Sequence, residues 1–185
     1  MRYEWGFDIY KRLSKSPGFV GVFPIDKLPR KLPDDSCGGV INLDISTGPG
    51  THWVAFFKQK GGGAEYFDPL GDRPPRQIES FLNRHSPIGV AYNKVPYQSE
   101  RSILCGNFCI FYLERRLAGQ SFCSITAVLS TNSTINDIIV SSCLNHPPSQ
   151  QSLLADLSEM PLPNLQTNQR SLKSQMRNSK SNCLS

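Results

Sequence analysis

The sequence lacks the apolar segments that secretion and membrane insertion require. Its longest uncharged apolar stretch, residues 103–113, is much shorter than the roughly 20 residues that cross a bilayer. The first five residues contain no apolar signal core. We therefore expect an intracellular protein, nuclear or cytoplasmic, that is neither secreted nor inserted in a membrane.

The cysteines are not spaced as in a metal site, and the expected intracellular location does not favour disulfide bonds. The chain has 6 of them without a zinc-finger pattern, and disulfides persist mainly in oxidising compartments. We therefore predict free thiols and no metal site.

Lys and Arg outnumber Asp and Glu by 20 to 15, for a net charge of +5, but no aromatic-basic stripe accompanies them. This charge favours no more than weak DNA binding.

Two parts of the chain differ in composition. Residues 1–148 have the mixed apolar, polar and aromatic composition of one compact domain, and they contain no internal repeat. Residues 149–185 are rich in Ser, Gln, Asn and Pro. Such a segment buries too little apolar surface to offset its ordering entropy, which predicts a largely disordered polar tail. Leucines within residues 151–160 leave room for one short helix there.

β-Branched and aromatic residues predict strands at residues 39–43, 52–57 and 64–68. The second and third should form a hairpin across the glycines at residues 61–63. With the turn centred near residue 60, the numbers of opposed residues add to about 120, so Val54 faces Tyr66 and His52 faces Asp68. This register would bring an imidazole and a carboxylate to one end of the hairpin.

Apolar periodicity predicts the remaining elements. A short amphipathic helix covers residues 76–83, and a strand near residues 88–92 runs toward Gln98. The longest helix begins at Cys105 and ends before Gly119, a residue type typical of helix C-termini. A last helix covers residues 135–144.

Cys105 combines the features of a nucleophile. A cysteine at a helix start faces free backbone amides and the positive end of the helix dipole, and both lower its pKa. The next residue, Gly106, lets a substrate backbone approach the sulfur. His52 is the best base, because Asp68 can fix its tautomer and stabilise its charged form. Gln98 lies on the segment leading into this helix, where its amide could donate to a developing oxyanion.

Several of these residues also have a purely structural interpretation. Asp68 precedes a proline and could simply begin a turn, and Gln98 could be an ordinary polar residue at a strand end. Cys109 falls inside the helix, where the amides are already bonded, and is interpreted as a buried core thiol. Trp53 is interpreted as a core residue or the wall of a cleft. The two remaining histidines are expected in exposed loops: His85 and His146.

The order of these motifs resembles that of the adenovirus maturation protease, adenain, and of its SUMO-protease relatives. The resemblance covers about residues 20–145. It rests, in chain order, on Gly50-Thr51-His52-Trp53, Asp68-Pro69-Leu70-Gly71, Gln98 and Cys105-Gly106-Asn107-Phe108-Cys109. Within this group the chain most resembles the adenain-type proteases of Polinton/Maverick elements and related large DNA viruses.

The resemblance implies an α+β fold of the papain-like cysteine peptidase type, with a central mixed β-sheet flanked by helices and the catalytic cysteine at a helix N-terminus. By motif, Cys105 is the nucleophile, His52 the base, Asp68 its orienting carboxylate and Gln98 the oxyanion donor. Adenain has glutamate where this chain has Asp68, whereas the SUMO proteases use aspartate. Aspartate at position 68 is therefore only a small departure from the adenain pattern.

The same resemblance assigns substrate binding to Trp53, and the missing side chain of Gly106 adds this residue to the substrate-binding set. No bound cofactor is implied. Adenain is activated by a peptide that forms a disulfide with a cysteine upstream of the catalytic glutamine. This chain has no cysteine between Cys37 and Cys105. An activator peptide, or DNA as an activator, is therefore implied by analogy alone.

The function implied is that of a cysteine endopeptidase. It would process viral or transposon capsid precursors at glycine or other small residues, as a monomer, in the cell or in a virion. One alternative is a protease that processes or deconjugates a ubiquitin-like modifier. Another is a domesticated binding module that has kept the fold and lost turnover, and the intact set of site residues argues against it.

Overall fold

The computed structural model describes residues 3–145 of the chain. The predicted polar tail, the short helix within it and His146 lie outside the described residues. The domain boundary at residue 148 therefore stays a prediction. No helix within residues 3–145 combines the length and the apolar character needed to cross a lipid bilayer.

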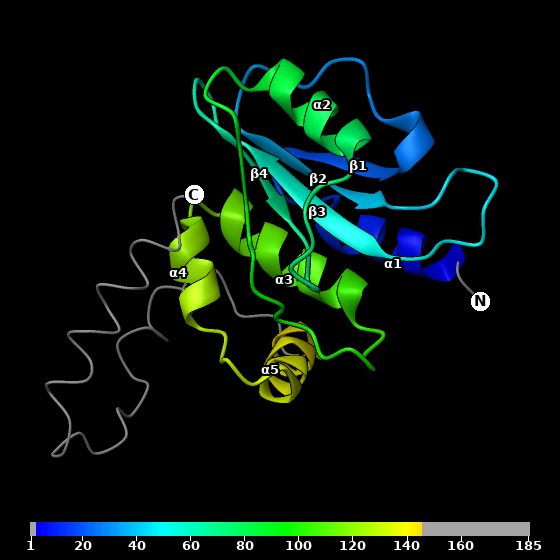
Figure 1. Ribbon diagram of the computed structural model, residues 1–185, viewed down its shortest axis with the longest axis vertical. Helices are drawn as coiled ribbons and strands as arrows, with labels where there is room; N and C mark the ends of the chain where they lie inside the picture. Colours follow the sequence, from blue (N-terminus) through cyan, green and yellow to red (C-terminus); the bar gives the residue numbers. More distant parts are fainter. Residues whose placement is uncertain (1–2, 146–185) are drawn as a thin grey trace, which may run out of the picture.

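A five-stranded mixed β-sheet forms the centre of the domain (Figure 1). The strands lie side by side in chain order: β1 (Phe19–Pro24), β2 (Cys37–Asn42), β3 (Trp53–Lys58), β4 (Ala64–Phe67) and β5 (Val90–Tyr92). The two inner pairings are antiparallel and the two outer pairings are parallel. Helices cover both faces of the sheet, which explains why β2 is buried throughout and β3 everywhere except its first residue.

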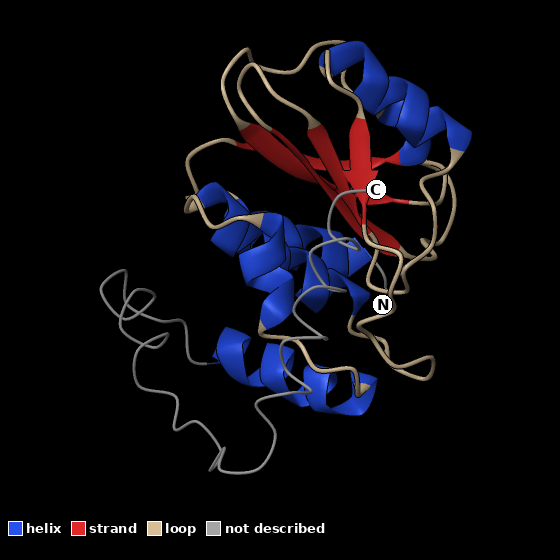
Figure 2. Cartoon of the chain, turned by 60° about the vertical axis from the view of Figure 1, so that its left-hand side comes forward, coloured by secondary structure: helices blue, strands red, loops and turns tan. Residues whose placement is uncertain are grey.

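The helices cover the two faces of the sheet unequally (Figures 1 and 2). On one face lies α2 (Arg76–His85), which buries Ile78, Phe81 and Leu82 at helical spacing. Burying each such side chain stabilises the fold by roughly 1.5–3 kcal/mol. The other face carries α3 (Cys105–Leu117), with α1 (Tyr3–Leu13) and α5 (Ser133–Asn145) packed against it. This second face holds the larger apolar core.

The central helix α3 begins and ends as its sequence predicts. Its first residue is Cys105, which lies beside His52 and the start of β3, and most of the following side chains are buried. Beyond its last turn, Gly119 adopts a positive φ of 94°. There its N–H bonds to the carbonyl of Arg116, and the N–H of Gln120 bonds to that of Arg115. These bonds satisfy carbonyls that the helix end would otherwise leave unpaired.

Some elements were not predicted. α1, β1 and the short α4 (Phe122–Ala127) had no assignment from the sequence. α1 carries the weak signal of Ile9 and Leu13, both fully buried one helical turn apart. The expectation of a loop at His85 is wrong, because this residue ends α2 and its Nδ1 lies 2.8 Å from the carbonyl oxygen of Phe81.

The hairpin forms as predicted, but its register is wrong by two residues. Ala55 pairs with Phe67, and Phe56 pairs with Tyr66, so opposed numbers add to 122 rather than 120. The physical reason is the turn, which the N–H of Gln59 closes by bonding to the carbonyl of Gly63. This bond centres the turn on residue 61. His52 and Asp68 therefore lie just beyond the ends of their strands rather than opposite each other within them.

Candidate active site

Three of the four predicted site residues form a chain of contacts at one end of the sheet, where β3 begins and β4 ends. The Nε2 atom of His52 lies 2.7 Å from Oδ1 of Asp68. The side chain of His52 is 16% exposed and that of Asp68 only 1% exposed. Since Nε2 faces the carboxylate, Nδ1 is the ring nitrogen available for the hydrogen bond between His52 and Cys105. The order Asp68, His52, Cys105 is that of an orienting group, a base and a nucleophile.

The electrostatics of the site favour a charged pair. Burial disfavours the charged imidazole, but hydrogen bonds with Asp68 and Cys105, together with their charges, outweigh it and raise the pKa of His52 to about 9. Burial likewise tends to raise the pKa of Cys105. The hydrogen bond and charge of His52, together with the backbone N–H groups of Trp53 and Gly106, lower it overall. Thiolate and imidazolium therefore stabilise each other near neutral pH.

Asp68 is held by a residue that the sequence did not single out. Asn93, which follows β5 and is 4% exposed, bonds both main-chain groups of Asp68. Its Oδ1 accepts from the N–H of Asp68 at 2.9 Å, and its Nδ2 donates to the carbonyl of Asp68 at 2.6 Å. The Asp68 carboxylate accepts further bonds from the N–H of Leu70 and the hydroxyl of Tyr66. The turn interpretation and the orienting interpretation of Asp68 are thus compatible.

The loop after Asp68 also places Gln98. The carbonyl of Pro69 accepts hydrogen bonds from the backbone N–H groups of Tyr97 and Gln98, at 2.8 and 2.9 Å. Gly71 closes this loop with a φ of 78°. A Cβ at this position would lie 2.7 Å from the backbone carbon of Val95, so the two loops pack too closely for a side chain. The segment that carries Asp68 and the one that carries Gln98 therefore form one unit.

Helix α5 holds the Gln98 segment from the other side. Asn136 on this helix is fully buried, and its Nδ2 donates to the carbonyl of Tyr97 at 3.0 Å. The hydroxyl of Ser99 donates to Oδ2 of Asp137 at 2.6 Å. The chain on both sides of Gln98 is therefore tied to α5. Neither α5 residue had a sequence signal, because their partners lie more than 35 residues away.

Gln98 itself lies in the wall of the groove that contains Cys105. It is 4% exposed, and its Nε2 donates one hydrogen bond, to the carbonyl of Ser102 at 2.7 Å. An amide nitrogen carries two N–H groups, so one donor remains. Within the described part of the chain, Oε1 of Gln98 is buried without a partner. The structure therefore brings Gln98 to the same groove as His52 and Cys105.

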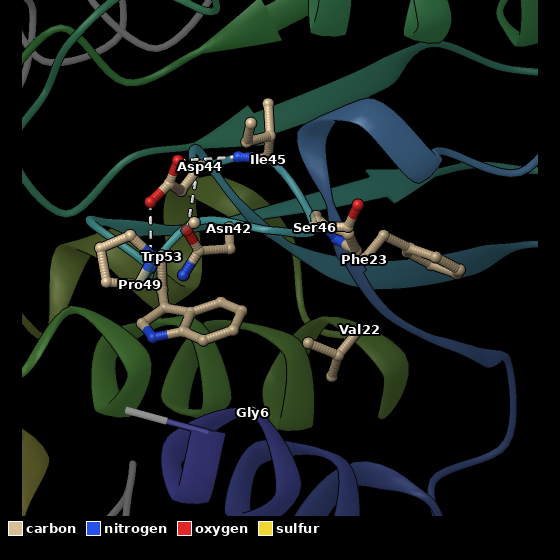
Figure 3. A pocket seen from close by; sticks show the side chains of 12 residues that line it. Gly6, Val22, Phe23, Asn42, Asp44, Ile45, Ser46, Pro49 and Trp53 are labelled. Atoms are coloured by element: carbon tan, nitrogen blue, oxygen red, sulfur yellow. Dashed lines mark hydrogen bonds between the residues drawn. The ribbon is translucent and has the colours of Figure 1, made fainter. Parts of the chain in front are cut away.

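Two cavities meet at Trp53. The first is the catalytic groove, a space of about 510 Å³ lined by His52, Trp53, Gln98 and Cys105 among others. The second is a more apolar pocket of about 190 Å³ between α1, the end of β1 and the loop of residues 44–50 (Figure 3). Trp53 lines both, and Gly6 on α1 packs beside its indole. Trp53 thus forms part of a cleft wall, which was one of the two interpretations of this residue.

The other described cysteines have no comparable environment. Cys109 is fully buried, and burial raises the pKa of its thiol well above the ordinary value. Its interpretation as a core thiol is confirmed. All of the described cysteines are free thiols, whereas Cys183 lies outside the described residues. Within residues 3–145, no three His, Cys, Asp or Glu side chains gather in a way that could hold a metal ion.

Comparison with known proteins gives relatives among viral proteases. No model of a known protein family matches the chain. A cysteine protease of African swine fever virus is 33% identical over 116 residues, which cover 56% of this chain and 41% of that protein. Its counterpart in a second isolate, described as a SUMO-1 cysteine protease, is 32% identical with the same coverage. The chain thus spans well under half the length of these relatives.

A solved structure shows the same fold. A selenomethionine crystal structure of the African swine fever virus protease matches with a TM-score of 0.53 at 19% identity, covering 76% of this chain and 66% of that chain. The predicted α+β fold class, a central mixed sheet flanked by helices, is confirmed. The predicted resemblance to viral cysteine proteases is confirmed by the sequence relatives. The Polinton origin stays a prediction.

Proposed function

We propose that the chain is a cysteine endopeptidase, a hydrolase of polypeptide bonds in which Cys105 is the nucleophile. The observation that carries the proposal is the contact chain from buried Asp68 through His52 to Cys105 at the start of α3. The pKa of Cys105 is lowered and that of His52 is raised to about 9, which is the combination that nucleophilic catalysis by a thiolate requires. Two similar viral proteins are named cysteine proteases.

In this mechanism the Cys105 thiolate attacks the carbonyl carbon of the scissile bond and forms a C–S bond. The negative charge moves to the carbonyl oxygen, which accepts a hydrogen bond from the remaining N–H of Gln98. The His52 imidazolium gives its proton to the leaving amine as the C–N bond breaks. His52 then takes a proton from water, the resulting hydroxide attacks the thioester, and Cys105 is released as thiolate.

The proposed substrate is a viral or transposon capsid precursor, cleaved at glycine or other small residues. Support for small residues comes from the groove beside Cys105, where Trp53 forms part of the wall and the next residue, Gly106, has no side chain. We further propose action as a monomer within the cell or a virion, without a bound cofactor. A second candidate is processing of a ubiquitin-like modifier, which is favoured by a relative described as a SUMO-1 protease.

Incubation of the purified protein with a peptide library, with and without DNA, tests the proposal directly. We expect cleavage that depends on Cys105 and clusters at glycine. A parallel reaction uses a glycine-ended modifier carrying a C-terminal electrophile, because only a modifier protease must recognise a folded modifier surface. Preferential labelling by the modifier over short peptides would support the second candidate. Absence of cleavage and of labelling by a folded chain would contradict both.

Gln98→Ala tests the oxyanion donor. A donor that strengthens as charge develops on the carbonyl oxygen acts in the transition state, so we expect kcat to fall roughly 10²- to 10³-fold with little change in KM. Iodoacetamide should still alkylate Cys105 at the parental rate, because the thiolate depends on His52 and the backbone amides. Parental hydrolysis by this variant would place the oxyanion donor elsewhere.

A further inference from the structure

We propose that Asn42 binds the main chain of the polypeptide substrate. Its side-chain amide would donate a hydrogen bond from Nδ2 to a peptide carbonyl oxygen in the groove beside Cys105. The inference rests on the proposed endopeptidase function and adds to it a substrate-binding residue outside the predicted set. No sequence pattern singles out Asn42, which lies at the end of β2, ten residues before His52.

The orientation of the Asn42 amide is fixed by the backbone around it. Its Oδ1 accepts hydrogen bonds from the N–H of Asp44 at 2.9 Å and from the N–H of Thr51 at 3.2 Å. Two N–H donors require an oxygen as their acceptor, so the amide cannot be reversed without losing both bonds. In Figure 3 the nitrogen accordingly points to the side of Trp53, away from Asp44.

The amide nitrogen is an unused donor at the surface of the groove. Asn42 is only 7% exposed, and among the described residues no acceptor bonds its Nδ2. Asn42, Gly50 and Trp53 are the residues that line both the catalytic groove and the neighbouring apolar pocket. Nδ2 therefore faces the junction of the two cavities. Because Nδ2 has no partner within the described part of the chain, it is free to donate to an acceptor supplied from outside.

Gly50 keeps this donor uncovered. A Cβ at position 50 would lie 3.1 Å from Nδ2 of Asn42, in the path of an incoming acceptor. The residue has a φ of 81°, a conformation that glycine adopts without strain. The backbone conformation and the close approach thus both favour glycine here, two residues before His52.

A peptide carbonyl is the acceptor that fits this position. Nδ2 is a neutral donor, and it lies in a groove whose walls carry His52 and Cys105. An extended polypeptide that presents its scissile bond to Cys105 passes along the same groove and offers a carbonyl at every residue. Such a carbonyl would give Nδ2 a hydrogen-bond partner, whereas an apolar group would leave the donor unpaired.

Asn42→Asp tests the inference with an isosteric change. The carboxylate keeps an acceptor oxygen for the N–H groups of Asp44 and Thr51 but removes the Nδ2 donor. The probe is a tetrapeptidyl chloromethyl ketone of sequence Ala-Ala-Gly-Gly, whose chloride the Cys105 thiolate displaces as the S–C bond forms. We expect the second-order rate to fall roughly 10- to 100-fold. Iodoacetamide, which has no peptide chain, should alkylate both proteins at similar rates and with the same pH profile.

Two controls separate recognition from structure and charge. Asn42→Ala loses the Oδ1 bonds as well, so it should also lower the unfolding temperature, whereas Asn42→Asp should not. An effect of the new charge alone would fade in about 1 M salt, where the Debye length is about 3 Å. The rate decrease caused by loss of the donor would persist in this salt. In ¹⁵N-labelled parent protein, the Asn42 side-chain amide resonances should shift after reaction with the peptidyl ketone and not after iodoacetamide.

The outcomes distinguish the inference from the function on which it rests. Parental reactivity of Asn42→Asp with the peptidyl ketone, or unshifted Asn42 amide resonances in the parent adduct, would overturn the inference alone. Asn42 would then act only on the loop of residues 44–51. A parent protein that reacts no more selectively with the peptidyl ketone than with iodoacetamide would count against the endopeptidase function, and against the inference with it.

Discussion

Cys105→Ala is expected to abolish peptide hydrolysis, with a loss of at least ~10⁴-fold in kcat, while the protein stays folded. No other described thiol can replace it at the groove. Cys105 alone stands at the start of α3, beside His52 and within reach of the backbone N–H groups of Trp53 and Gly106. Hydrolysis of a peptide found in the library and thermal unfolding of the same sample are the two measurements.

The matched control for this prediction is Cys109→Ser, one helical turn further along α3. Cys109 is fully buried, and its pKa is raised well above the ordinary value by burial. Serine there places a hydroxyl in an apolar core, so the effect should fall on stability rather than on kcat. A folded but inactive Cys109→Ser protein, together with an active Cys105→Ala protein, would show that the nucleophile is assigned to the wrong residue.

His52→Ala is expected to be nearly as severe for hydrolysis, and its effect should also be visible in the thiol itself. The hydrogen bond with His52 is the leading cause that lowers the pKa of Cys105, and the charge of His52 lowers it further. Without them the thiol should return toward an ordinary pKa of about 8.5. Alkylation by iodoacetamide at pH 6 should therefore slow by roughly 10-fold or more, because little thiolate remains at that pH. An unchanged rate would argue against the pairing.

The pH dependence of the parent enzyme follows from the same pair. As pH falls, hydrolysis should decline when the Cys105 thiolate, whose pKa is lowered, takes up a proton. As pH rises, hydrolysis should decline near pH 9, because the His52 imidazolium loses the proton that the leaving amine needs. Alkylation requires only the thiolate and should not share the alkaline decline. A hydrolysis rate that keeps rising above pH 9 would contradict proton donation by His52.

Much of the site could be predicted because its information is local. The helix that begins at Cys105 follows from apolar periodicity within a few turns and from the glycine that ends it. The hairpin follows from two short strands around three glycines, and it alone is enough to bring His52 near Asp68. Gln98 could be named because it lies a short distance before the helix start. Each of these inferences depends on residues that are close in sequence.

The tertiary structure decided what depends on distant partners. The predicted hairpin register was wrong by two residues, because the composition of the turn does not reveal the hydrogen bond between Gln59 and Gly63. Asn93 bonds Asp68 from 25 residues away, and Asn136 bonds Tyr97 from 39 residues away. The local sequence around an asparagine does not show which distant backbone groups its side chain will hydrogen-bond.

By itself, the sequence was enough to predict which residues carry the proposed chemistry, because those residues lie in local helix, turn and hairpin patterns. The structure decided how those residues are held and how a substrate would be bound. The Nδ2 donor of Asn42 is the clearest case. Its role depends on the N–H groups of Asp44 and Thr51, on Gly50 and on a groove shared with Cys105. That arrangement exists only after β2, β3 and α3 have packed together, since long-range packing sets which donors remain free.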